Sequence, residues 1–175
     1  MSPPDMTALV DGYYRPLYLF ALSLSRNEAS ALDLTQETFY KWAVHGHKLR
    51  EADKVKSWLF TTLYREFLNS QRRIQKWPHE EFVEAVHESS VPRPDAMNTA
   101  DAGTVMEALQ RMEEIYRVPL TLFYLDQMSY REIAVMLEVP AGTIMSRLSR
   151  GKVQLRVLLS DPKMKGKVVP FRPAL

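Results

Sequence analysis

Cysteine is absent from the 175 residues, which excludes disulfides, thiolate catalysis and cysteine-ligated zinc or iron–sulfur sites. No apolar run reaches the about 18 residues of a membrane span. The first residues, MSPPDMTALVDGYY, lack the basic and apolar regions of a secretory signal. A cytoplasmic location without membrane insertion is therefore the default expectation.

A strong charge of either sign is also missing, because the formal net charge is only +2. The whole chain is thus no general binder of polyanions, and an argument for nucleic-acid binding depends on where the cations lie. The histidines are scattered at His45, His47, His79 and His87, without the spacing of metal ligands. No phosphate-binding glycine loop or nucleophile motif is present. We expect no enzyme, no metal and no cofactor.

Helical periodicity dominates what is present. Apolar residues recur at spacings of three and four from about residue 5 to 25, where Pro16 is expected to kink or break the helix. Asn27 is a good cap for a second helix to about His45. Gly46 is expected to end that helix in the left-handed conformation.

A third helix is predicted from a cap at Ser57 to Lys76, and it combines aromatic with cationic side chains. Residues 65–76 contain four cations and one acid, and the aromatic residues of the first turns are Trp58, Phe60 and Tyr64. Aromatic rings and cations together suit unpaired bases and their phosphates. The alternative is burial of the aromatic rings in a core, which is favoured for each ring taken alone.

Residues 77–103 differ from both flanks. They include three prolines and six acids against one arginine. Such a segment can bury little surface, so its composition predicts a flexible acidic linker. The predicted fold class is therefore all-α, with two small helical domains at 1–76 and 104–160 and a loosely ordered basic tail at 161–175.

The second domain ends in two short helices joined by a tight turn. Its first helix is expected to open near Thr104, and Pro119 to restart the chain in a further helix. Ser129 then caps one short helix, and Pro140 opens a basic helix with Arg147 and other cations. This pattern is typical of a helix-turn-helix that reads DNA. The alternative is a helix pair in an all-α core whose basic face is only solvated.

Three motifs in order resemble bacterial sigma factors of the extracytoplasmic-function type. Residues 33–39, DLTQETF, are similar to the family's D-L-x-Q-E-T-F run. Residues 58–60 with 72–73 resemble its W-L-[FY]…RR helix. Residues 129–134 and 139–148 match the pattern of its helix-turn-helix.

The resemblance implies a transcription initiation factor that binds core RNA polymerase and directs it to promoters. The polymerase contacts would be the β′ clamp and the β flap, and an anti-sigma factor is a further expected partner. Polymerase binding would fall to Asp33, Gln36, Glu37, Phe39 and Tyr40. The −10 element of the promoter DNA would be recognised and melted by Trp58, Thr61, Arg65, Asn69, Arg72, Arg73 and Lys76. The −35 element would be read by Ser129, Arg131, Thr143, Met145, Ser146, Arg147 and Arg150.

Two departures from the family pattern leave the promoter sequence open. Met145 stands where the family often has lysine, and Gly151-Lys152 replaces the usual alanine-arginine ending. A rival interpretation is a sigma-like interaction module that sequesters an anti-sigma factor without binding DNA. Another is an ordinary helix-turn-helix regulator, which would leave residues 33–39 unexplained.

Overall fold

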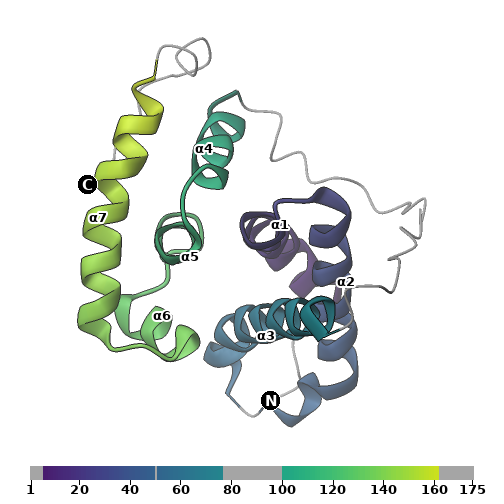
Figure 1. Ribbon diagram of the computed structural model, residues 1–175. Helices are drawn as coiled ribbons and strands as arrows, with labels where there is room; N and C mark the ends of the chain where they lie inside the picture. Colours follow the sequence, from purple (N-terminus) through teal and green to yellow (C-terminus); the bar gives the residue numbers. More distant parts are fainter. Residues whose placement is uncertain (1–5, 50, 77–99, 162–175) are drawn as a thin grey trace. The chain divides into compact units, whose positions relative to one another are not determined.

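The computed structural model describes residues 6–49, 51–76 and 100–161. The chain divides into two compact units, of which the first contains α1 to α3 and the second α4 to α7. All regular structure in the described residues is helical (Figure 1), which confirms the predicted all-α class. None of these helices combines the length and the hydropathy needed to cross a bilayer. Most of the predicted linker, residues 77–99, lies outside the described residues.

The first unit is built from α1 (Met6–Ser25), α2 (Glu28–His45) and α3 (Val55–Lys76). Two 3-10 turns, η1 (Gly46–Lys48) and η2 (Ala52–Lys54), lie between α2 and α3. All three helices pack against one another, and their core includes Phe20 and Phe60, whose ring centroids are 5.5 Å apart. This packing turns the remaining faces of α2 and α3 to solvent.

Of the three features predicted for α1 and the ends of α2, one is confirmed and two differ. α1 continues through Pro16 without a break. The cap at Asn27 is confirmed, because its side chain accepts a hydrogen bond from the Ser30 N–H at 2.9 Å. The expected left-handed Gly46 is wrong, since its φ is −60°. A Cβ at Gly46 would lie 2.6 Å from the Trp42 ring, so close packing rather than a turn requires glycine there.

α3 also starts earlier than predicted. Its first residue is Val55, so Ser57 lies inside the helix and is not its cap, because the chain enters α3 directly from η2. Leu59 and Leu63, four residues apart on one side of the helix, are fully buried. Ile74 is 53% exposed, and every residue from 71 to 76 is exposed. The last turns of α3 therefore present side chains to solvent all round.

The second unit contains α4 (Ala100–Gln110), α5 (Glu114–Tyr124), α6 (Tyr130–Leu137) and α7 (Ala141–Leu159). α4 starts before the predicted 104, so the last residues of the predicted linker are helical. α7 packs on the other three helices of this unit (Figure 1).

The break between α4 and α5 lies before Pro119, not at it. The expected restart at Pro119 is wrong, because α5 begins at Glu114 and runs through the proline. The chain turns at residues 111–113 instead, where buried Arg117 donates a hydrogen bond to the Met112 carbonyl at 2.6 Å. The apolar spacing of the sequence does not predict this cap, because it depends on a buried arginine side chain that bonds to a carbonyl five residues earlier.

α6, α7 and their connecting turn form the predicted helix-turn-helix. Ser129 caps α6 through a reciprocal pair of bonds: its hydroxyl accepts from the Glu132 N–H at 3.3 Å, and its own N–H donates to the Glu132 carboxylate at 2.7 Å. Glu138 ends α6 in the left-handed conformation, with φ of 55°. Pro140 caps α7 one residue before its first turn.

Gly151 lies where α7 packs most closely on α5. A Cβ at this position would lie 2.9 Å from Leu120 Cδ1 and 3.3 Å from Tyr116 Cβ. The glycine therefore lets the two helices approach, although it costs up to about 1 kcal/mol relative to alanine in a helix. Ile144 and Leu148 continue the same buried stripe toward the helix-turn-helix.

Candidate functional site

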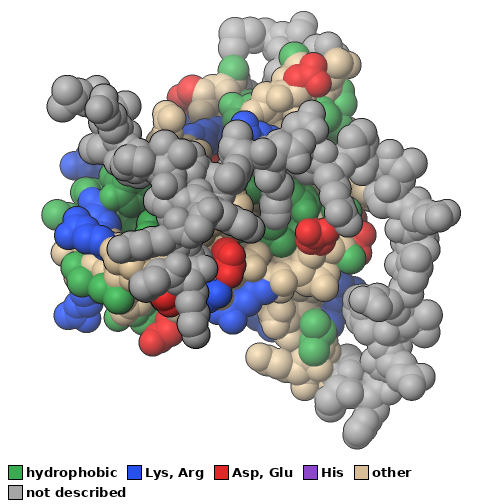
Figure 2. Space-filling model, turned by 90° about the horizontal axis from the view of Figure 1, so that it is seen from above, with side chains coloured by type: hydrophobic (Ala, Val, Ile, Leu, Met, Phe, Trp, Pro, Cys, Tyr) green, Lys and Arg blue, Asp and Glu red, His purple; other side chains and the backbone are tan. Residues whose placement is uncertain are grey.

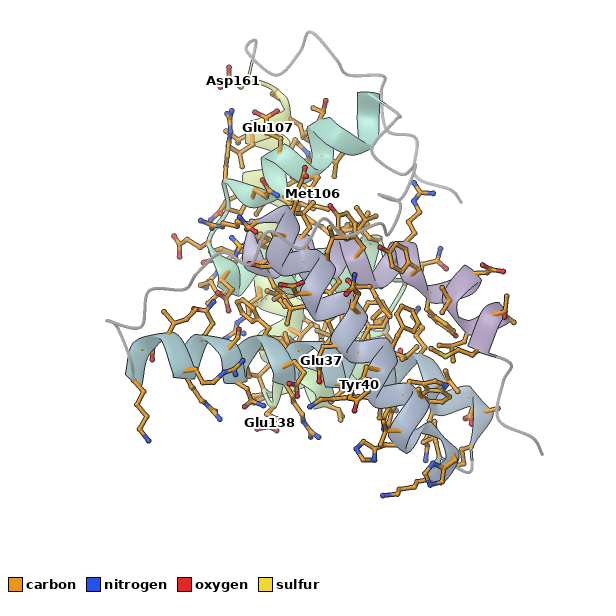
Figure 3. All side chains as sticks on the ribbon, turned by 90° about the vertical axis from the view of Figure 1, so that its right-hand side faces the viewer. Glu37, Tyr40, Met106, Glu107, Glu138 and Asp161 are labelled. Atoms are coloured by element: carbon orange, nitrogen blue, oxygen red, sulfur yellow. The ribbon has the colours of Figure 1, made fainter. Side chains whose placement is uncertain are left out.

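The outer face of α2 presents a patch of acid, amide and phenol groups. Asp33, Gln36, Glu37 and Tyr40 are all exposed, and their spacing of three and four places them on neighbouring turns. Figure 3 labels Glu37 and Tyr40 on this stretch of α2. The four predicted polymerase-binding residues with polar groups thus share one surface, here called the α2 face.

Phe39 does not belong to that surface. Its side chain is only 7% exposed and lies on the core side of α2, where its ring stacks on Tyr14 with centroids 6.2 Å apart. Its assignment as a surface contact is therefore wrong: the spacing of Phe39 from Thr35 and Trp42 places all three on the buried side. Phe39 instead supports the α2 face from behind.

The exposed side of α3 carries the cations of the predicted −10 surface. Exposed side chains here are those of Arg65, Asn69, Arg72, Arg73 and Lys76, which together we call the α3 face. Trp58 and Thr61, earlier in the helix, are half-buried. The structure thus brings most of the predicted DNA-binding residues of this helix to solvent, concentrated in its second half.

The aromatic residues of α3 contribute less to this surface than the sequence suggested. Phe60 is fully buried against Phe20, so for this ring the core alternative holds. Trp58 packs edge-on against Trp42, with ring centroids 5.2 Å apart, and Tyr64 is half-buried. Among the aromatic residues of these first turns, only Trp58 and Tyr64 keep part of their surface exposed, so any stacking of bases is limited to these two rings.

An ion pair joins α2 to α3 between these two faces. Lys41 Nζ lies 2.6 Å from Glu66 Oε1, and both side chains are partly buried. Glu66 is the one acid within residues 65–76, so its pairing with Lys41 leaves the cations of the α3 face to dominate their surroundings. Because Lys41 and Glu66 are 25 positions apart in the sequence, no local sequence pattern predicts this contact.

The predicted −35 residues surround the turn of the helix-turn-helix. Arg131, Met145, Ser146 and Arg150 are exposed, and Thr143 and Arg147 are half-buried. Ser129 is exposed but its hydroxyl and amide are engaged in capping α6, so it orients the helix pair. On the left of Figure 2, where α7 lies, Lys and Arg side chains alternate with hydrophobic ones.

Lys152 is less available to a partner than its charge suggested. Its Nζ lies 5.5 Å from the ring centroids of both Phe123 and Tyr124, within reach of a cation–π interaction. Phe123 in turn stacks on Tyr130, with centroids 5.2 Å apart. A side-chain hydrogen bond with Tyr124 raises the pKa of Lys152. Lys152 thus helps to hold α5, α6 and α7 together.

Metal ligation finds no support in the part of the chain that the structure describes. It contains no group of three His, Asp or Glu side chains placed to hold an ion. His79 and His87 lie outside the described residues. The surfaces above are suited to binding by charge and shape.

Comparison with known families matches both units. The model of sigma-70 region 2 matches residues 9–77, and the model of sigma-70 region 4 matches residues 102–155. The first match covers the α2 and α3 faces, and the second covers the helix-turn-helix.

Several characterised relatives align over most of their length. The sigma factor SigM of Bacillus subtilis is 27% identical over 148 residues, covering 83% of this chain and 90% of that protein. SigL of Mycobacterium tuberculosis is 29% identical over 161 residues, covering 89% of each. Both are named as extracytoplasmic-function (ECF) RNA polymerase sigma factors.

A solved structure agrees with these relatives. The sigma factor RpoE of Bartonella quintana, crystallised in complex with the anti-sigma factor NepR, superposes with a TM-score of 0.68 at 27% identity. The superposition covers 89% of this chain and 97% of that one. With both regions matched in order, the chain belongs to the sigma-70 family of RNA polymerase sigma factors, in its ECF group.

Proposed function

We propose that this chain is a transcription initiation factor that binds core RNA polymerase and directs it to promoters with two recognised elements. The observation that carries the proposal is the matched order of regions 2 and 4, each coinciding with an exposed polar or cationic helix face. Such a factor acts by binding and carries out no catalysis itself. We expect it to act in the cytoplasm, where polymerase and promoters are found.

Polymerase binding is assigned to the α2 face. Asp33 and Glu37 supply carboxylates and Tyr40 is 64% exposed, which suits a basic helical partner such as the β′ clamp. Complementary charge of this kind accelerates association and weakens as salt is added. A second contact, between the region 4 unit and the β flap, would leave the two units to engage separate parts of the polymerase.

The −10 element is assigned to the α3 face. Arg65, Arg72 and their cationic neighbours can hold phosphates of the non-template strand, while Asn69 can bond to base edges. The segment that leads into the first turn of α3, at about residues 48–56, would receive a flipped base. Extruding a base costs a few kcal/mol, which stacking and pocket contacts can offset without nucleotide hydrolysis.

The −35 element is assigned to the helix-turn-helix, with the start of α7 in the major groove. Arg147 is half-exposed in the second turn of α7 and Arg150 is exposed near its middle, and arginine can bond bidentately to guanine. One such pair is worth about 1–3 kcal/mol of discrimination. Arg131 on α6 would bind a phosphate of the DNA backbone.

Run-off transcription with purified core polymerase on a promoter library tests the proposal. We expect transcripts that depend on the added chain. Glu37→Lys should reduce polymerase binding yet spare DNA binding by the region 4 unit, while Asp11→Lys makes the same charge change on α1 and should have no effect. Arg147→Ala should weaken binding to the upstream half alone, with Arg156→Ala, further along α7, as its control.

An anti-sigma factor is a further proposed partner, supported by the complex in which the Bartonella relative was solved. The same complex supports the alternative function, a sigma-like module that sequesters an anti-sigma factor without binding DNA. The transcription assay distinguishes the two functions. A module of the second kind binds neither polymerase nor promoter, and charge reversal at Glu37 or removal of Arg147 would change nothing.

A further inference from the structure

The first turns of α7 expose a face with little charge. Met145 is 55% exposed, and Gly142 and Ser149 lie one turn before and after it on the same side. Both neighbours are small, so the Met145 thioether is the longest side chain on this side of the first turns of α7. It projects where the second helix of a helix-turn-helix meets base edges.

The polar residues beside Met145 have few donors to offer. The Ser146 hydroxyl donates a hydrogen bond to the Thr143 carbonyl at 2.9 Å, so its hydrogen is directed back into the helix. Thr143 itself is half-buried. On the side of α7 that carries Met145, direct reading of bases is therefore left largely to an apolar group, whereas Arg147 and Arg150 lie on other sides of the helix.

The Met145 side chain is not part of the buried stripe by which α7 packs in the unit. Ile144 and Leu148 are buried and hold this end of α7 in the core, at about 100° and 60° around the helix axis from Met145. A side chain needed for neither packing nor solubility at this position is free to serve recognition.

We propose that Met145 selects thymine in the upstream promoter element by apolar contact with the thymine C5-methyl group in the major groove. The inference rests on the proposed function. That methyl is the apolar group that base pairs present in the major groove, and a flexible, polarisable thioether adapts well to it. Lysine at this position would instead seek guanine or phosphate, so the methionine gives this chain a different preference.

Uracil substitution isolates the methyl group, because uracil keeps every hydrogen-bonding group of thymine. The holoenzyme, assembled from the full chain and purified core polymerase, first selects from a DNA library randomised in the upstream element alone. Its binding to the selected DNA is then compared with binding to the same DNA carrying uracil there. We expect about a fourfold loss per contacted methyl, the ratio that corresponds to ~0.8 kcal/mol.

Variants then assign the loss to one side chain. Met145→Leu should keep the preference for thymine over uracil, Met145→Ala should abolish it, and Met145→Lys should shift the selected sequences toward guanine. Val157→Ala is the matched control, because Val157 is 67% exposed on the same helix but lies roughly 18 Å further along its axis. It should leave the preference intact.

Two results would overturn the assignment while leaving the proposed function standing. One is equal binding of thymine and uracil DNA by the unaltered holoenzyme, and the other is a preference that survives in Met145→Ala. Failure of the holoenzyme to select any sequence would instead overturn the proposed function, and this inference with it.

Discussion

The Lys41 ammonium and the Glu66 carboxylate, 2.6 Å apart, join the helix of the α2 face to the helix of the α3 face. The side chains are 32% and 21% exposed, so water screens the pair only in part. The contact adds to the core packing that sets how the acidic face and the cationic face are turned relative to each other within the first unit. The ion pair also neutralises the charge of Glu66, the one acid within residues 65–76, beside the proposed DNA contacts.

A double-mutant cycle of Lys41→Met and Glu66→Gln measures this pair. We expect a coupling free energy of about 0.2–1 kcal/mol in chemical denaturation, because partial exposure and side-chain entropy limit the gain. The coupling should shrink in high salt. A coupling free energy above this range would contradict the expectation, and would mean that solvent screens the Lys41–Glu66 pair less than its partial exposure suggests.

Gly151→Ala should destabilise the second unit although alanine is the better helix former. The new methyl would lie 2.9 Å from Leu120 and 3.3 Å from Tyr116, so α7 would have to move from α5. Gly103→Ala in α4 is the matched control, since nothing lies within 4 Å of its added Cβ, and it should stabilise by up to about 1 kcal/mol. Thermal unfolding of both variants compares the two; a stabilised Gly151→Ala would contradict the close packing.

Glu138→Gly should stabilise the second unit by up to about 1 kcal/mol. Glu138 has φ of 55°, a conformation that costs an ordinary residue but not glycine, and the greater freedom of glycine in the unfolded chain offsets part of the gain. Glu138→Ala keeps the penalty and should bring no such benefit. Equilibrium denaturation distinguishes them, and an equal effect of both variants would trace the change to the lost carboxylate.

Tyr14→Phe should leave the first unit equally or more stable at neutral pH. The Tyr14 hydroxyl is buried and finds no hydrogen-bond partner among the described residues, and an unsatisfied buried polar group costs about 1–3 kcal/mol. Denaturation at pH 7 measures the change. A clear loss of stability would instead indicate that the hydroxyl bonds to a group outside the described residues.

The same residue gives a pH dependence with a definite sign. Burial raises the pKa of Tyr14 above its ordinary value, because the phenolate is harder to desolvate than the phenol. The stability contributed by the neutral phenol is complete below the unfolded pKa of about 10 and is lost as pH rises through the folded pKa. Tyr14→Phe should therefore flatten part of the alkaline fall in stability, as followed by denaturation at increasing pH.

Periodicity predicted the helices because each face repeats within a few residues, and the exposed sides of α2 and α3 followed from the same spacing. The errors occur where a particular side-chain contact, and not the repeat of apolar residues, decides the local structure. Gly46 is required by the Trp42 ring, and Arg117 caps a turn that no local pattern marks. Lys152 lies against rings from another helix, so its charge alone overstated its availability.

Phe39 divides the motif at residues 33–39 into two independent sets. Leu34, Thr35, Thr38 and Phe39 face the interior, whereas Asp33, Gln36 and Glu37 face outward. Asp33, Gln36 and Glu37 can therefore be substituted without changing the fold. Under the proposed assignment of the α2 face, exchanging these side chains would give initiation factors that bind altered polymerases in place of the native enzyme, on an unchanged fold.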